Sequence, residues 1–171
     1  PLDNNIYDVV FSIGLIEHFK YPEKVIQEHY RVAKPGGWVI LYIVPNKISE
    51  VQKKFNLFNK LLKVFFSSKK KIEKKDVYRT NYSGDYYNNL IKKFNFDKKI
   101  ITGIYSMPMI SHSPEFPFSL MPKFFEKTLV LIFYFLSATR KFFFKKNSWL
   151  CKEKNGNAIL VAIKKAKIYN F

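Results

Sequence analysis

The stretch Tyr7-Asp-Val-Val-Phe-Ser-Ile-Gly14 is a short, mostly apolar run rich in β-branched and aromatic residues. Such a run predicts a strand that is buried on both faces, as in parallel sheets. Tyr21-Pro-Glu-Lys24 then predicts a helix start, because proline fits the first helical position and glutamate suits the positive N-terminus. Lys34-Pro-Gly-Gly37 ends that helix, and Trp38-Val-Ile-Leu-Tyr-Ile-Val44 predicts a second buried strand. The whole stretch therefore predicts one β-α-β unit with parallel strands and a right-handed crossover.

The rest of the chain contains weaker signals for further elements. Apolar residues at alternating spacings of four and three, with lysines between them, predict a basic amphipathic helix over 51–66. Four prolines predict an irregular loop over 106–122. A helix is expected from Tyr82-Ser-Gly-Asp85 to about residue 94, a strand over 98–105, and a last strand over 158–163.

Composition excludes several classes of protein. The chain has 171 residues, of which 47% are hydrophobic, so wholesale disorder is excluded and one domain is the expectation from length. A single cysteine, Cys151, and three histidines exclude a disulfide framework, a zinc ribbon or an iron–sulfur scaffold within this sequence.

The charge is high and uneven. The formal net charge is +17, and residues 46–75 hold ten lysines against Glu50 and Glu73. Such a surplus favours anionic partners such as nucleic acid or acidic lipid headgroups. Only three of the basic residues are arginine, which phosphate and base recognition favours, and an A/T-biased genome would also enrich lysine. Nucleic acid is therefore not the expected partner.

The segments Pro1-Leu-Asp-Asn-Asn-Ile-Tyr-Asp-Val-Val-Phe-Ser-Ile-Gly-Leu-Ile-Glu-His-Phe19 and Tyr30-Arg-Val-Ala-Lys-Pro-Gly-Gly-Trp-Val-Ile-Leu41 resemble class I S-adenosylmethionine-dependent methyltransferases of the small-molecule "type 11" family. The resemblance rests on a strand, Glu17-His18 at its exit, a helix and Arg31-Val-Ala-Lys-Pro-Gly-Gly37, in this order and spacing. It implies an α/β, Rossmann-like methyltransferase fold, of which this chain would hold the C-terminal part, strands four to seven, with helical insertions.

The resemblance also implies that parts of the family's cofactor site are missing. The family binds S-adenosylmethionine through a Gly-rich loop after its first strand and a carboxylate after its second, and this sequence has no such loop. We therefore expect a fragment that lacks about three strand–helix units and is inactive alone. In the family's sheet the first strand lies beside the fourth, so the strand at 7–13 should be an exposed edge.

Candidate site residues follow from the same resemblance. Ser12, Ile13 and Gly14 would line the methionine end of the cofactor, although Gly14 could simply allow a tight turn. Glu17 and His18 are the candidate catalytic residues, with His18 either taking a proton from the acceptor or orienting the substrate.

Asn46 and Tyr82 would face the same rim as substrate contacts. Some relatives place a metal-binding glutamate where Gly14 stands here, so no metal site is expected.

The apolar run 128–138 could suggest a membrane segment. As a helix it would be about 16 Å long, whereas a bilayer core needs about 30 Å. It is therefore expected to be a buried helix or an interfacial one. Together with the basic helix it could form a membrane-surface face for an anionic bilayer, or it could be a substrate lid.

These observations give one expected organisation. Residues 1–105 would form the C-terminal half of a methyltransferase core with a basic insertion at 47–80, residues 106–155 an insertion or lid, and 156–171 the final strand and tail. The expected function is methyl transfer from S-adenosylmethionine to a small-molecule or lipid-like acceptor, in the cytoplasm or peripherally at the membrane. The alternatives are part of an RNA methyltransferase and a non-catalytic binding module.

Overall fold

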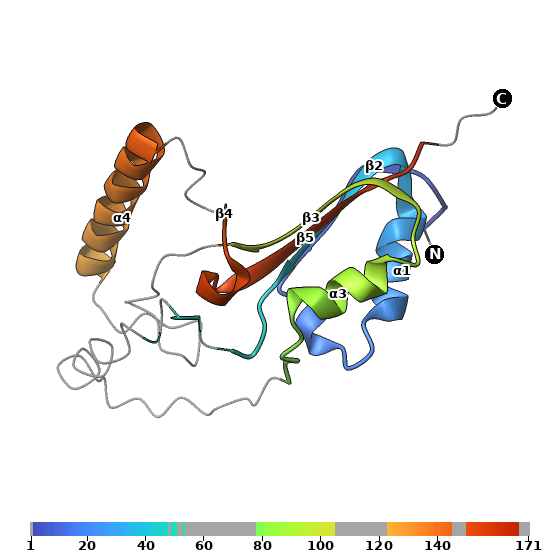
Figure 1. Cartoon of the computed structure of the whole chain (residues 1–171), viewed down its shortest axis with the longest axis horizontal. Coiled ribbons are helices and arrows are strands. Elements are labelled where there is room, and N and C mark those ends of the chain that lie inside the picture. The colour runs from blue at the N-terminus through green and yellow to red at the C-terminus, as the bar shows by residue number, and fades with distance from the viewer. Residues whose placement is uncertain are drawn as a thin grey trace.

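A five-stranded mixed sheet organises the computed structural model of the chain, which describes residues 2–47, 49–50, 53, 78–104, 123–144 and 150–167 (Figure 1). The spatial order of the strands is β1-β2-β5-β3-β4. The strands are β1 (Tyr7–Ile13), β2 (Ala33–Ile43), β3 (Phe96–Ile104), β4 (Leu150–Cys151) and β5 (Ala158–Lys165). The helices are α1 (Glu23–Val32), α3 (Gly84–Ile91) and α4 (Lys123–Phe144), with short 3-10 turns η1 (Ile16–His18) and η2 (Glu153–Asn155).

The predicted β-α-β unit is present. β1 and β2 are parallel and α1 connects them, starting after Pro22, whose carbonyl accepts a hydrogen bond from Ile26 N at 3.0 Å. The end of the helix differs from the prediction that residues 34–37 terminate it: α1 ends at Val32, and residues 34–37 already lie in β2. A Cβ at Gly37 would lie 2.9 Å from Asp8 O, so the two strands approach each other closely at this glycine.

The remaining strands complete an α/β sheet of the Rossmann-like type. β5 is antiparallel to both of its neighbours, β2 and β3, so β3 runs in the same direction as β1 and β2. The expected strands at 98–105 and 158–163 correspond to β3 and β5, whereas the two-residue β4 was not expected. The expected helix after Tyr82 is α3, and Ser83 Oγ caps it by accepting from Tyr86 N at 3.4 Å.

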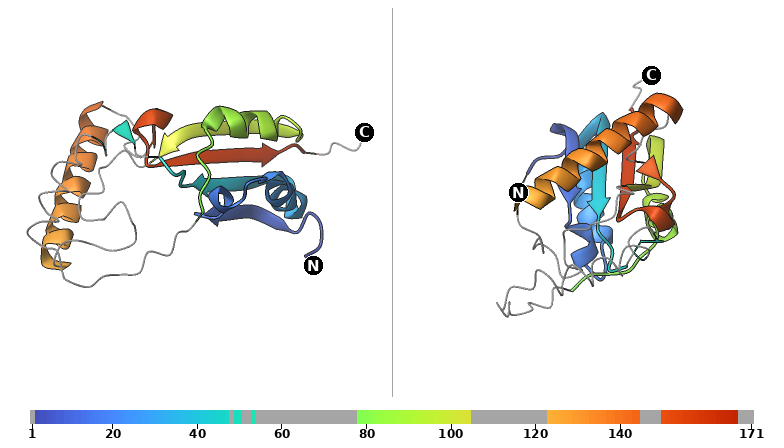
Figure 2. Two further views of the ribbon diagram at one scale, coloured as in Figure 1. Left: turned by 90° about the horizontal axis from the view of Figure 1, so that it is seen from below. Right: turned by 90° about the vertical axis from the view of Figure 1, so that its left-hand side faces the viewer.

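The core lies on one face of the sheet only. In Figures 1 and 2, α1 and α3 lie on the same side of the sheet. Val39, Leu41 and Ile43 of β2 and Ile159, Val161 and Ile163 of β5 point to that side and are buried. The buried hydrophobic cluster consists of Ile16, Ile26, Ala33, Val39, Leu41, Ile43, Tyr87, Leu90, Ile91, Ile159, Val161 and Ile163.

The opposite face, which we call the open face, contradicts the prediction that the first strand is buried on both sides. Val9, Phe11 and Ile13 of β1 are 51%, 65% and 69% exposed. Their register partners on β2 are Trp38, Ile40 and Tyr42. No described helix covers this face, so the apolar run of β1 has a packing partner for only half of its side chains. The expectation that this strand is a sheet edge is confirmed, since β1 is the first strand in the order.

Helix α4 includes the apolar run at 128–138 and lies apart from the sheet (Figures 1 and 2). Its described side chains are mostly exposed, so the expectation of a buried helix is wrong for them. Among the described helices, none is long and apolar enough to cross a membrane. The predicted basic helix at 51–66 and the loop at 106–122 lie outside the described residues, apart from Lys53.

Candidate functional site

The candidate site begins at the turn that follows β1. Gly14 has a φ of +63°, which L-residues with side chains rarely adopt, and its N–H donates to Tyr42 O at 2.9 Å. This bond ties the turn to the end of β2. Open α/β sheets bind ligands outside the carboxyl ends of their strands, where this turn lies.

The three residues predicted to line the cofactor do not share one side of the sheet. Ser12 is 7% exposed and faces the core side, whereas Ile13 is exposed on the open face. Gly14 lies between these surfaces. Among the described residues, an added Cβ would meet only Glu17 Oε1 within 4 Å, at 3.6 Å, so the Gly14 backbone is accessible to a ligand there.

Residues 78–82 cross the ends of β1 and β2 and bring the other predicted residues together. Thr80 N donates to Glu17 O at 2.7 Å, and Asn46 N donates to Thr80 O at 3.0 Å. Tyr82 Oη donates to Lys20 O at 2.9 Å. Glu17, Asn46 and Tyr82, far apart in sequence, therefore lie along one rim.

His18 is fixed on the same rim. Its Nδ1 lies 2.6 Å from Tyr78 O. A carbonyl oxygen can only accept, so Nδ1 carries the hydrogen, and Nε2 of the neutral ring keeps its lone pair. The ring is half-buried, which leaves Nε2 able to accept a proton from a bound molecule.

Glu17 lies beneath the rim instead of on it. The residue is 1% exposed, and its Oε2 has no hydrogen-bond partner among the described residues. Ser12 Oγ is likewise buried without a partner. Burial raises the pKa of the nearby Tyr87 to about 12, with the Glu17 carboxylate among the further causes of the rise, so this phenol stays protonated. A buried polar cluster thus supports the Gly14 turn from below.

The two predicted substrate contacts are placed differently. The Asn46 side chain is exposed, and its backbone fixes the crossing segment. The Tyr82 hydroxyl donates a hydrogen bond to Lys20 O, and the Tyr82 ring stacks on the Tyr86 ring with centroids 3.9 Å apart. Tyr82 therefore offers a ring edge to a substrate more readily than a free hydroxyl.

Sequence reasoning missed the contacts of Glu153. Its Oε1 lies 2.8 Å from Lys47 Nζ, and its Oε2 accepts from Gly84 N at 2.9 Å. Lys47 and Glu153 are 106 positions apart, so no local pattern could have paired them. Thr80, in the segment that crosses the ends of β1 and β2, belongs to no sequence motif that could have indicated its role.

One groove of the described structure lies away from this rim. This groove of about 500 Å³ lies between α1 and the end of α3 and is lined by Tyr30, Phe94 and Lys165, among others, without any predicted site residue. Within the described ranges, no three metal-ligating His, Cys, Asp or Glu side chains gather. Among the described residues, the candidate site is a rim beside the β1 edge of the sheet.

Comparison with known proteins supports the resemblance at the start of the chain. Residues 1–41 match the family model described as "Methyltransferase domain", and this segment carries most of the predicted resemblance. No curated protein matches the chain.

Several solved structures are similar to the chain. A SAM-dependent methyltransferase from Thermotoga maritima is 17% identical, with a TM-score of 0.49, over 96% of this chain and 59% of that one. One from Archaeoglobus fulgidus is 8% identical, with a TM-score of 0.48, over 96% and 62%. Phosphoethanolamine N-methyltransferase 2 from Haemonchus contortus, in complex with phosphomonomethylethanolamine and S-adenosylhomocysteine, is 17% identical, with a TM-score of 0.45, over 98% and 35%. The chain thus spans 59% of the Thermotoga structure.

Proposed function

We propose that this chain, whose first 41 residues match a methyltransferase domain, forms the part of an S-adenosylmethionine-dependent methyltransferase that holds the methionine end of the cofactor and faces the acceptor. The acceptor is a small molecule or a lipid-like molecule. The observation that carries the proposal is the accessible Gly14 turn at the carboxyl end of β1, above buried oxygens of Ser12 and Glu17 that have no partner in the described part of the chain.

The residues of this rim fit one end of the cofactor. The open backbone at Gly14 lets a ligand approach closely, while the buried Ser12 and Glu17 oxygens lie beneath the turn. When bound, S-adenosylmethionine supplies a methyl group on a positively charged sulfur. His18 Nε2 takes the proton that an acceptor hydroxyl or amine loses, because Tyr78 O already holds Nδ1. Glu17 acts as a positioning residue beneath the turn, and Asn46 and Tyr82 border the acceptor.

The rest of the cofactor needs residues that the sequence does not contain. None of its six glycines forms the G-x-G spacing of a Gly-rich loop. The unpaired edge of β1 and the open face offer a place for further strand–helix units, because an unpaired strand and an exposed apolar surface both call for cover. We therefore propose that the 171-residue chain alone is inactive.

The test measures S-adenosylmethionine binding by equilibrium dialysis. The chain alone and the chain produced together with the coding sequence upstream of Pro1 are compared. We expect saturable binding only by the longer protein. Tight binding by the 171-residue chain alone would refute the claim that the cofactor site is incomplete.

A matched pair of glycine variants then tests the site itself in the longer protein. Gly14→Ala and Gly36→Ala both place a side chain at positive φ, +63° and +80°, so their backbone strain is similar. Only Gly14 lies at the carboxyl end of β1. We expect Gly14→Ala to weaken cofactor binding at least tenfold more than Gly36→Ala, and equal effects would remove Gly14 from the site.

A further inference from the structure

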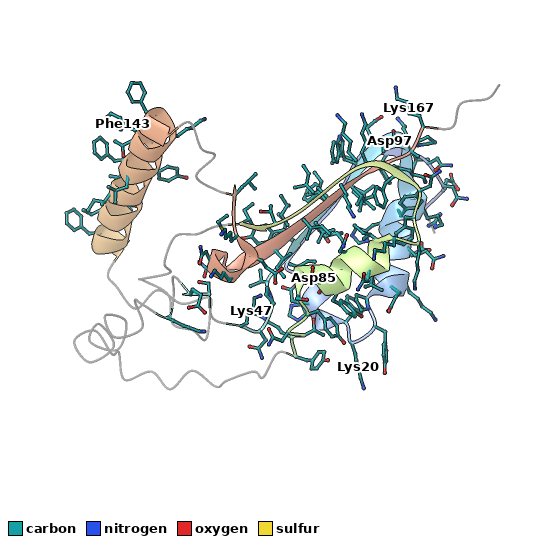
Figure 3. All side chains as sticks on the ribbon, in the orientation of Figure 1. Lys20, Lys47, Asp85, Asp97, Phe143 and Lys167 are labelled. Atoms are coloured by element: carbon teal, nitrogen blue, oxygen red, sulfur yellow. The ribbon has the colours of Figure 1, made fainter. Side chains whose placement is uncertain are left out.

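Helix α4 exposes a large apolar surface. Phe124, Leu131, Phe135 and Phe142 are 75%, 68%, 69% and 79% exposed. Figure 3 shows rings that project from this helix into open space, with Phe143 among them. Single exposed apolar residues are normal, but a contiguous set of this kind marks an interaction surface.

The exposed side chains are ordered around the helix. Phe124, Leu131, Phe135 and Phe142 follow one another at spacings of seven, four and seven residues, which places them on one line along the helix. Lys127, Tyr134 and Lys141 are spaced by seven and form a second line along one border of the first, and all three are exposed. The helix thus presents an apolar face with a basic and tyrosine border.

The 22 residues of α4 would span about 33 Å as a straight helix. No described helix is both long and apolar enough to cross a membrane. Ile132, Leu136 and Phe143 are exposed on the other side of this line, so the exposed apolar surface is broad, and Lys127 and Lys141 lie at one of its borders. At a membrane surface the rings of such a helix lie between the headgroups and its ammonium groups in water.

We propose that α4 binds the surface of an anionic lipid bilayer. Charge identifies this occupant, because the border of the apolar face carries Lys127 and Lys141 and the whole chain has a net charge of +17. Tyrosine at the border suits the headgroup level. The surface of α4 is distinct from the cofactor rim, so the proposal does not depend on methyl transfer.

Two other occupants are outcomes of the test. The open face of the sheet is also apolar, and α4 of the same chain or of a second copy could cover it. Both would bury the line of Phe124, Leu131, Phe135 and Phe142 in protein without any lipid.

The experiment measures co-sedimentation of the full chain with phosphatidylcholine vesicles, with and without phosphatidylserine, at low and high salt. We expect binding only with phosphatidylserine, and weaker binding at high salt. Leu131→Asp combined with Phe135→Asp should reduce binding at least about tenfold. Lys127→Gln combined with Lys141→Gln should reduce it about fivefold per lysine.

The matched control is Phe11→Asp, which changes an aromatic side chain of the open face that is 65% exposed. This variant should bind vesicles like the unchanged chain. A Phe135→Trp variant should add fluorescence that brominated lipids quench. The two lysine substitutions keep the apolar face intact, so they still test the proposal if the aspartate variant does not fold.

Four outcomes would overturn the proposal. These are no binding to phosphatidylserine vesicles, unchanged binding by the Leu131/Phe135 variant, loss of binding in Phe11→Asp alone, and a lipid-free dimer that the Leu131/Phe135 variant dissociates. The third outcome would make the open face the lipid-binding surface. The fourth would make a second copy the partner of α4.

Discussion

Replacing Glu153 by alanine should destabilise the fold more than the position of this residue in a surface turn suggests. The Glu153 carboxylate bridges Lys47 Nζ, which follows β2, and Gly84 N, which begins α3, at 2.8 and 2.9 Å. Figure 3 labels Lys47 and Asp85, which mark these two chain segments at the same end of the sheet. One side chain therefore holds three segments that are distant in sequence.

The expected loss follows from the two contacts. A hydrogen bond from a backbone N–H to a charged acceptor contributes about 1.5–3 kcal/mol. The ion pair contributes less, up to about 1 kcal/mol, because the Lys47 and Glu153 side chains are 30% and 29% exposed. Glu153→Ala should therefore cost about 2–3 kcal/mol of unfolding free energy, and Glu153→Gln, which keeps an acceptor for Gly84 N, about 1 kcal/mol.

The assay is urea denaturation followed by far-ultraviolet circular dichroism, with Lys47→Met and the double variant to complete a thermodynamic cycle. Glu28→Ala is the matched control, because its ion pair with Arg31 lies within α1 and the Glu28 side chain is 61% exposed. It should cost no more than about 0.5 kcal/mol. A loss for Glu153→Ala no larger than that of the control would refute the bridging role.

Three further predictions test the burial pattern. Leu41→Ala, at 1% exposure on the covered side, should cost about 2–5 kcal/mol in urea denaturation, whereas Phe11→Asp, at 65% on the open face, should stay within about 0.5 kcal/mol. Because burial raises the pKa of Tyr87 to about 12, the folded chain holds this proton more tightly than the unfolded chain, whose tyrosine titrates near 10. The stability advantage over Tyr87→Phe should therefore be complete below pH 10 and should fall by about 2 kcal/mol as the pH rises towards 12; an unchanged difference would contradict this. Gly37→Ala should lower the midpoint of thermal unfolding, because its Cβ would lie 2.9 Å from Asp8 O.

The order of the first elements was predictable because their signals are local. The apolar run of β1, the proline before α1 and the apolar run of β2 each act within a few residues, and the structure contains all three elements. Periodicity could not reveal that β1 is exposed on one face. An apolar run indicates a strand that is suited to burial on both faces. Whether both faces are in fact buried depends on elements elsewhere in the chain or on other chains.

In the candidate site, too, local sequence signals predicted some residues and missed others. Gly14, Glu17 and His18 follow directly from the matched segment, and the structure places them at the end of β1. The bonds that hold the rim come from Thr80 and Tyr78, more than 50 residues later, through backbone atoms that any residue type supplies. Sequence therefore indicated the residues nearest the turn and missed the segment that crosses it.

The open face of the sheet and helix α4 both expose apolar side chains, but the backbone of β1 and the backbone of α4 differ in their hydrogen bonding. The outer edge of β1 carries N–H and C=O groups without strand partners among the described residues, and a further strand would pair with them while apolar side chains cover Val9, Phe11 and Ile13. In α4 the backbone bonds are closed within the helix, so a fluid surface without directional partners is sufficient. The proposed lipid partner of α4 and the proposed protein partner of the sheet therefore make different demands on the chain. This difference explains why substitutions at Phe11 and Phe135, similar in exposure and chemistry, should separate the two kinds of binding.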